Sequence, residues 1–195
     1  MGGKARAETL SCKAKGGFRE KADTTDNCIS CKCKDATDKC TLYPHNGGCC
    51  PSGQEAHHLV PAHCFILPSE RDKPLADQQK YAGCGKYNHH RAPCICLPKQ
   101  KHVKMHQDFD AREDRGLTTE AGTWSYKQAR DAAARSVKEM YGDNCPEACI
   151  KAQLDAYHKE EADIEDDTTL RRDSTGNRGD PPRSELAVSR STHFG

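Results

Sequence analysis

The sequence predicts an α+β fold in which a pair of short strands precedes a set of helices. Two β-prone runs support the strands: "HHLVP" enters a turn at Pro61, and "APCICLP" is closed by Pro98. The segment that follows, "KQKHVKMHQDFDAR", is compatible with a helix whose apolar contacts are Val103, Met105 and Phe109. We therefore expect a strand, a second strand and a helix in that order.

The composition indicates a small ordered core. Only 34% of the 195 residues are hydrophobic and 6% are aromatic, while 30% are charged, so we expect part of the chain not to order itself. We divide the chain into a Cys-rich segment (1–50), the strand and helix unit (51–110), a helical extension (111–165) and a disordered polar tail (166–195). The Cys-rich segment should consist of loops and short strands.

Two helices are expected in the extension. Residues 126–141 are rich in Ala and Lys and stop at Gly142. The next helix should begin near Asn144, where Pro146 can occupy the first turn, and run to about Ile164. Both helices follow from local composition alone.

Charge and hydropathy limit the classes of partner. The formal net charge is +1, so contact with nucleic acid would have to be local. No run is long enough to span a bilayer, and "MGGKARAETL" lacks the apolar stretch of a secretory signal. We expect a soluble chain without a membrane partner, cut as a module from a longer protein and exported, if at all, by another signal or machine.

Thirteen cysteines are far above ordinary usage, and seven of them lie in the first fifty residues. The spacing in "CISCKC" allows a structural zinc site formed by Cys28, Cys31, Cys33 and Cys40. It equally allows disulfides and free thiols, which an oxidising compartment would favour. The pattern leaves both alternatives open.

Four histidines have the spacing of a metal-dependent active site. His102 and His106 are four residues apart and share one face of the expected helix. Together with His57 they could hold a divalent metal and leave a coordination position open. Adjacent strand residues point to opposite faces, so His58 is free to act as a general base, with an unperturbed pKa of about 6.5.

This order of motifs resembles the ββα-metal finger of the HNH and endonuclease VII nucleases. The doubled histidine and the terminal H-x-x-x-H are closest to the colicin-type DNases. The segments "GCCPSGQEAHHLVP" and "YNHHRAPCICLP" are similar to histidine-rich nucleases among bacterial polymorphic toxins. The resemblance implies His57, His102 and His106 as metal ligands and His58 as the base. It also makes Glu55 a partner of a ligand or of an arginine.

The chain departs from the family at one position. The asparagine that braces the loop carrying the base would be expected near Ala92 or Pro93, which have no side-chain amide, so Asn88 or His90 would have to replace it. His63 is expected to pack beside Phe65 and not to bind a ligand. Weaker candidates for phosphate contacts are Arg91, His90 and Lys104.

The resemblance implies a metal-dependent endonuclease that hydrolyses DNA with little sequence specificity, using zinc, nickel, magnesium or manganese. It further implies an antibacterial toxin, the C-terminal domain of a type VI secretion effector, made in the bacterial cytoplasm and delivered into a target cell. The implied partners are DNA, a cognate immunity protein and the secretion apparatus or upstream effector domains. A non-catalytic zinc-stabilised binding module and an RNase on the same scaffold are the alternatives.

Overall fold

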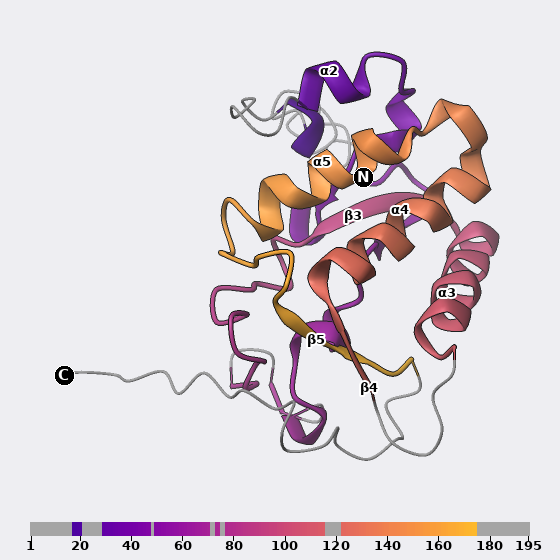
Figure 1. Ribbon diagram of the computed structural model, residues 1–195. Helices are drawn as coiled ribbons and strands as arrows, with labels where there is room; N and C mark the ends of the chain where they lie inside the picture. Colours follow the sequence, from indigo (N-terminus) through magenta and orange to yellow (C-terminus); the bar gives the residue numbers. More distant parts are fainter. Residues whose placement is uncertain are drawn as a thin grey trace, which may run out of the picture.

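The computed structural model describes residues 17–20, 29–47, 49–70, 73–74, 77–115 and 122–174, and it confirms the α+β class (Figure 1). The strands form two antiparallel sheets, one with order β1-β3-β2 and one pairing β4 with β5. The strands are β1 (Tyr43–Pro44), β2 (Gln54–His58), β3 (Pro93–Pro98), β4 (Gly122–Ser125) and β5 (Thr169–Arg172). The α-helices are α2 (Ile29–Cys33), α3 (Lys99–Glu113), α4 (Tyr126–Tyr141) and α5 (Glu147–His158). Short 3₁₀ turns are η1 (Phe18–Glu20), η2 (Asp38–Cys40), η3 (His45–Gly47), η4 (Ala62–Phe65), η5 (Pro68–Glu70) and η6 (Gly142–Asn144).

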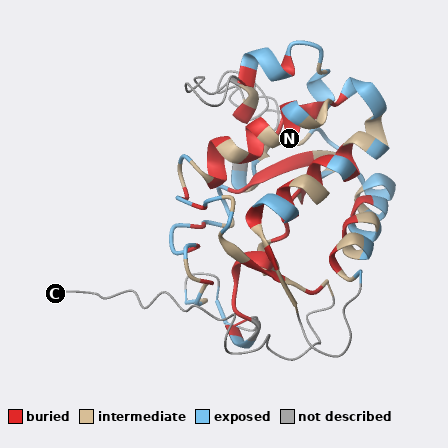
Figure 2. Ribbon diagram, in the orientation of Figure 1, coloured by how far each residue is buried: buried red, intermediate tan, exposed pale blue. Residues whose placement is uncertain are grey.

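The β2, β3 and α3 elements form the unit that the sequence predicts. β3 and α3 have the expected positions, and α3 starts directly after Pro98 and contacts both strands. β2 begins earlier than expected and stops at His58, opposite Cys94; the next position of β3 is Pro93, which has no backbone N–H to donate. Leu59 and Val60 instead enter the core, where they are buried. Figure 2 shows β3 buried and α3 with an exposed outer face.

The extension contains both predicted helices. Ser125 accepts a hydrogen bond from the Gln128 backbone and completes a capping box at the start of α4, and Gly142 ends this helix with a φ of 64°. α5 begins after Pro146 but ends at His158 instead of Ile164. The chain reverses there, with the Ile164 N–H donating to the His158 carbonyl at 2.7 Å, and Ile164 is buried in the core.

Disulfides connect the Cys-rich segment to the rest of the chain. Cys33 is bonded to Cys149, Cys40 to Cys145 and Cys50 to Cys96. Cys31 is also disulfide-bonded, and Cys28 lies outside the described residues. The prediction of a structural zinc site at Cys28, Cys31, Cys33 and Cys40 is therefore wrong for the three described cysteines, because a disulfide sulfur is no longer a thiolate ligand.

Both ends of the described chain carry more regular structure than expected. The Cys-rich segment contains α2 and several 3₁₀ turns besides the short β1. The expected disordered tail is wrong at its start, because β5 pairs with β4 and buries Leu170. Arg171 is buried with it and forms an ion pair with Asp173. Residues 175–195 lie outside the described part of the chain.

The core joins the strands to α3, α4 and α5 through residues such as Ile95, Leu97, Phe109, Val137 and Leu154. Figure 1 shows α3 beside α4, with the β4–β5 pair below the N-terminal end of α4 in this view. Within the described ranges, no helix combines the length and the apolar character that crossing a bilayer requires.

His158 is the histidine buried deepest in this core, with 1% of its surface exposed. Its ring stacks on Phe65 at 5.3 Å between centroids, and Nδ1 donates to the Leu154 carbonyl at 2.9 Å. Burial lowers the pKa of His158 to about 3, although the bond to Leu154 opposes the shift. The folded protein therefore keeps this ring neutral where the unfolded chain protonates it.

The free energy of unfolding of His158→Phe is expected to fall less steeply in acid than that of wild type. The unfolded ring has a pKa of about 6.5, so below that pH the unfolded state binds a proton that the folded state refuses, and the free energy of unfolding falls. Removing this one group should reduce the slope of the free energy of unfolding against pH by about 1.4 kcal/mol per pH unit between roughly pH 6 and pH 4. Urea denaturation of the oxidised protein at several pH values measures it, and parallel profiles for variant and wild type would contradict the assignment.

Candidate metal centre and active site

Three of the predicted histidines converge in the structure. His57 lies on β2, while His102 and His106 lie one turn apart on α3. One ring nitrogen from each lies within 4.8 Å of the other two. The His57 ring meets both partners edge-on, with centroids 4.8 Å from His102 and 4.4 Å from His106. Because α3 follows β3 without a linker, the strand register and the helix period together fix this arrangement.

Burial favours the form of His57 and His106 that binds metal. His57 is only 2% exposed, and burial, helped by the neighbouring His106, His102 and His58, lowers its pKa to about 2. Burial and His102 also lower the pKa of His106. A neutral imidazole offers a nitrogen lone pair, whereas a protonated one does not. The His57 ring is therefore neutral at physiological pH.

Glu55 holds one of the three rings from outside the cluster. Its Oε2 lies 2.6 Å from His102 Nδ1. A carboxylate can only accept, so Nδ1 carries the proton and the lone pair of the neutral ring is on Nε2. Carboxylate contacts of this kind orient histidine ligands in metal sites. The structure thus places Glu55 where the sequence predicts a partner for a ligand.

The donor set fits a transition-metal ion. His57 Nδ1 is buried and has no hydrogen-bond partner in the protein. The Nε2 atoms of His102 and His106 are 3.1 Å apart. Two nitrogens on a tetrahedral zinc ion would be separated by roughly 3.3 Å, given Zn–N bonds of about 2.0–2.1 Å. The two α3 histidines therefore already have nearly the spacing that one shared ion requires.

His58 faces away from this cluster, as strand alternation predicts. Its Nε2 lies 3.1 Å from the His89 carbonyl oxygen, which can only accept a hydrogen bond. The neutral ring is therefore protonated on Nε2 and has its lone pair on Nδ1. Burial lowers the pKa of His58 to about 3, against the opposing effect of the bond to His89. His58 is thus in the protonation state that a base needs.

Asn88 stabilises the loop that presents the His89 carbonyl. Its Oδ1 accepts the His90 N–H at 2.9 Å, and its own backbone is held by the Tyr157 hydroxyl, which accepts from Asn88 N and donates to Asn88 O. This arrangement is an Asx turn anchored to α5. Asn88 therefore lies where it can brace the loop, in place of the amide missing at Ala92.

The residues suggested for phosphate binding lie around the site in different settings. The Arg91 guanidinium forms an ion pair with Glu161. His90 is exposed, in the same loop as the His89 carbonyl that contacts His58. Lys104 is exposed on α3 two residues from both His102 and His106, which places its side chain on the opposite helix face. Phosphate binding by these three residues stays a prediction.

Sequence reasoning missed two groups near the site. His45, in η3, stacks on His58 with ring centroids 4.5 Å apart. His63 does more than pack beside Phe65: its Nε2 bonds to Glu113 Oε1 at 2.8 Å, and Glu113 is fully buried. Neither group has a sequence signature, because neither pair has a helical or strand spacing: His58 lies 13 residues from His45, and Glu113 lies 50 residues from His63.

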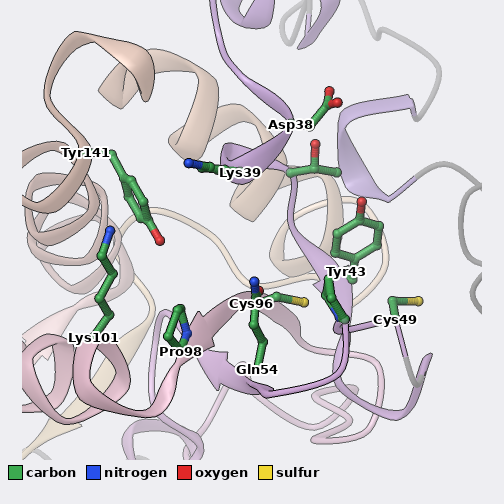
Figure 3. Close-up of a pocket in the computed structure, with 11 residues that line it drawn as sticks. Asp38, Lys39, Tyr43, Cys49, Gln54, Cys96, Pro98, Lys101 and Tyr141 are labelled. Atoms are coloured by element: carbon green, nitrogen blue, oxygen red, sulfur yellow. The ribbon is translucent and has the colours of Figure 1, made fainter.

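A separate cavity of about 400 Å³ opens where the start of β2 meets the starts of α3 and η2 (Figure 3). Tyr43 and Tyr141 contribute aromatic rings, and Lys101 lies over the Tyr141 ring at 4.3 Å. The cavity is also lined by Gln54 and Lys39. No histidine lines it, so it is distinct from the cluster of His57, His102 and His106.

Comparison with known proteins finds similarity to a toxin. Over 152 residues the chain is 28% identical to the DNase toxin Tse7 of Pseudomonas aeruginosa. The chain is similar to a DNase toxin. The match covers 69% of this chain but 38% of Tse7, so the chain spans well under half of that protein's length. No protein-family model matches the chain, and no solved structure matches it.

Proposed function

We propose that this chain is the nuclease part of a DNA-cleaving toxin and hydrolyses phosphodiester bonds at the His57, His102 and His106 cluster. The observation that carries the proposal is the convergence of three imidazole nitrogens within 4.8 Å, together with the neighbouring His58, which faces the other side of β2 in the tautomer of a base. The similarity to Tse7, a protein named as a DNase toxin, supports the same reaction. The ββα order of β2, β3 and α3 agrees with an HNH-type nuclease.

Each residue has a defined part in the proposed reaction. His57, His102 and His106 would hold a divalent metal, which when bound supplies Lewis-acid stabilisation of the charge that develops on the scissile phosphate. His58 accepts through Nδ1 the proton of the attacking water, while its Nε2–H remains bonded to the His89 carbonyl. None of these contacts reads a base, so we expect cleavage with little sequence specificity.

The biological setting follows from the same proposal. A toxin that cuts DNA endangers the cell that makes it, so we propose a cognate immunity protein that blocks the site. We further propose synthesis in the bacterial cytoplasm and delivery into a target cell by a type VI secretion apparatus, with upstream effector domains. The disulfides of the described chain are consistent with passage through an oxidising compartment.

Plasmid cleavage tests the reaction. Disulfide-intact protein should convert supercoiled plasmid to nicked and linear forms with at least one of magnesium, manganese, nickel or zinc, and a chelator should stop it. The double variant His102→Ala/His106→Ala should be inactive. Gln107→Ala, an exposed change on the same helix, should match wild type.

The outcomes separate the alternatives. Folded, metal-loaded protein that leaves plasmid intact would exclude the DNase. Cleavage of RNA alone would indicate a ribonuclease on this scaffold. Binding of metal without cleavage of either nucleic acid would indicate the non-catalytic module.

Glu55→Gln is expected to lower the affinity of the His57, His102 and His106 cluster for metal without removing a ligand. The amide keeps the size of the carboxylate but loses the charge that orients His102 through the 2.6 Å contact. Loss of such a partner weakens metal affinity by about 10–100-fold. Competition with a chromogenic chelator measures the affinity, and the variant should recover cleavage when the metal concentration is raised. An unchanged affinity would show that Glu55 does not act on the centre.

A further inference from the structure

A second cluster of imidazoles lies on the other side of β2 from the His57 centre. His45, His89 and His90 each offer a ring nitrogen within 4.8 Å of the other two. The His45 and His89 centroids are 4.6 Å apart, and those of His89 and His90 are 5.3 Å apart. The cluster combines η3 with the loop that follows Tyr87, two segments more than forty residues apart in the sequence.

The backbone holds these two segments together, while His45 Nδ1 lies 3.3 Å from Asn46 Oδ1, which leaves Nε2 of that ring for another partner. The His45 N–H donates to the Ala92 carbonyl at 3.1 Å, and the Asn46 N–H donates to the His90 carbonyl at 2.9 Å. The His89 carbonyl is occupied by His58, and the His90 N–H by Asn88. The main chain of the loop is therefore fixed by its own hydrogen bonds, and the three rings are positioned without having to bond to one another.

A polar atom in this cluster lacks the partner that burial normally requires. His89 Nδ1 is shielded from solvent and has no hydrogen-bond partner in the protein. Such an atom costs free energy unless something binds it. His90, by contrast, is exposed, so the cluster is open to the solution on that side. A cation could enter there and keep coordination positions for water.

We propose that His45, His89 and His90 form a second metal site, which binds a divalent transition ion of the zinc, nickel, cobalt or copper class. Three imidazoles select these ions over magnesium and calcium, which prefer oxygen ligands. The site is separate from the His57 centre, because it shares no ligand with it. It adjoins the proposed base, since His45 stacks on His58.

Counting bound ions tests the second site independently of any nuclease activity. The full chain, without a polyhistidine tag and with its disulfides intact, is stripped of metal and titrated with cobalt(II) in excess magnesium. Native mass spectrometry gives the number of ions, and the visible absorption of cobalt reports nitrogen ligation. The variants are His90→Ala, at an exposed position, and His102→Ala/His106→Ala, which removes two ligands of the first centre.

Wild type should bind two ions and each variant one, and the triple variant should bind none. His90→Ala should weaken the second binding step at least about tenfold, because a ligand is lost. The second site would be overturned if wild type bound one ion and His90→Ala still bound it. It would also be overturned if His90→Ala bound two ions. Two ions with intact plasmid would support the second site even though the nuclease proposal had failed.

Discussion

Replacing His58 with alanine is expected to lower the rate of DNA cleavage by about 10²–10⁴-fold, the usual contribution of a general base. The reason is geometric. His58 is adjacent to the proposed ligand His57 but faces away from it, and its Nε2 is committed to the His89 carbonyl, so only Nδ1 can take a proton. The rate is measured on supercoiled plasmid at saturating metal and compared with wild type.

A separate measurement distinguishes loss of the base from loss of the metal. His58→Ala should bind the first ion as tightly as wild type, since none of the three ligands has changed, whereas His57→Ala should lose both metal and activity. The two changes are one residue apart on the same strand, which makes them matched controls. If His58→Ala cleaves DNA at the wild-type rate, another group takes the proton, and the role assigned to His58 is wrong.

The elements that local sequence determines were predicted well. β3 ends at Pro98, α3 follows it, and α4 begins at Tyr126 and stops at Gly142, all as proline, glycine and helical composition indicate. His102 and His106 are held together by the helix itself. Their meeting with His57 required only that the helix fold back along the strand pair, which the short connection makes hard to avoid.

The features that depend on distant parts of the chain could not be predicted. β5 lies in a segment whose composition indicates disorder. It is a strand because it pairs with β4, and its Arg171 is buried in an ion pair with Asp173. The position of His45 against His58 depends on backbone bonds between η3 and the loop ending at Ala92. The cysteine spacing near residue 30 could not decide between zinc and disulfides, because the sulfurs bonded to Cys33 and Cys40 lie more than a hundred residues away.

Those distant partners lead to the second large effect, on stability. The Cys33–Cys149 and Cys40–Cys145 bonds span 116 and 105 residues, and they join α2 and η2 to the start of α5. Closing a loop of about 100 residues stabilises the folded state by about 4.7 kcal/mol in the chain-entropy description. That is a large part of the roughly 5–15 kcal/mol by which a domain is stable.

The two bonds should not contribute additively, because they close nearly the same loop. With either one in place, the other closes only a short ring through 33–40 and 145–149, worth about 3 kcal/mol. Removing one bond, as Cys33→Ala/Cys149→Ala or Cys40→Ala/Cys145→Ala, should therefore cost about 3 kcal/mol. Removing both should cost about 7–8 kcal/mol, which exceeds the sum of the two single losses.

Urea denaturation of wild type, the two double variants and the quadruple variant measures this coupling. The excess is the loss of stability in the quadruple variant minus the sum of the losses in the two double variants. The cavities left by the alanines contribute equally to both quantities, so they cancel from this excess. A positive excess would show that the two bonds substitute for each other in tying the N-terminal segment to α5. Strictly additive losses would mean that the denatured chain already holds these segments together, and the bonds would then act on the folded state instead.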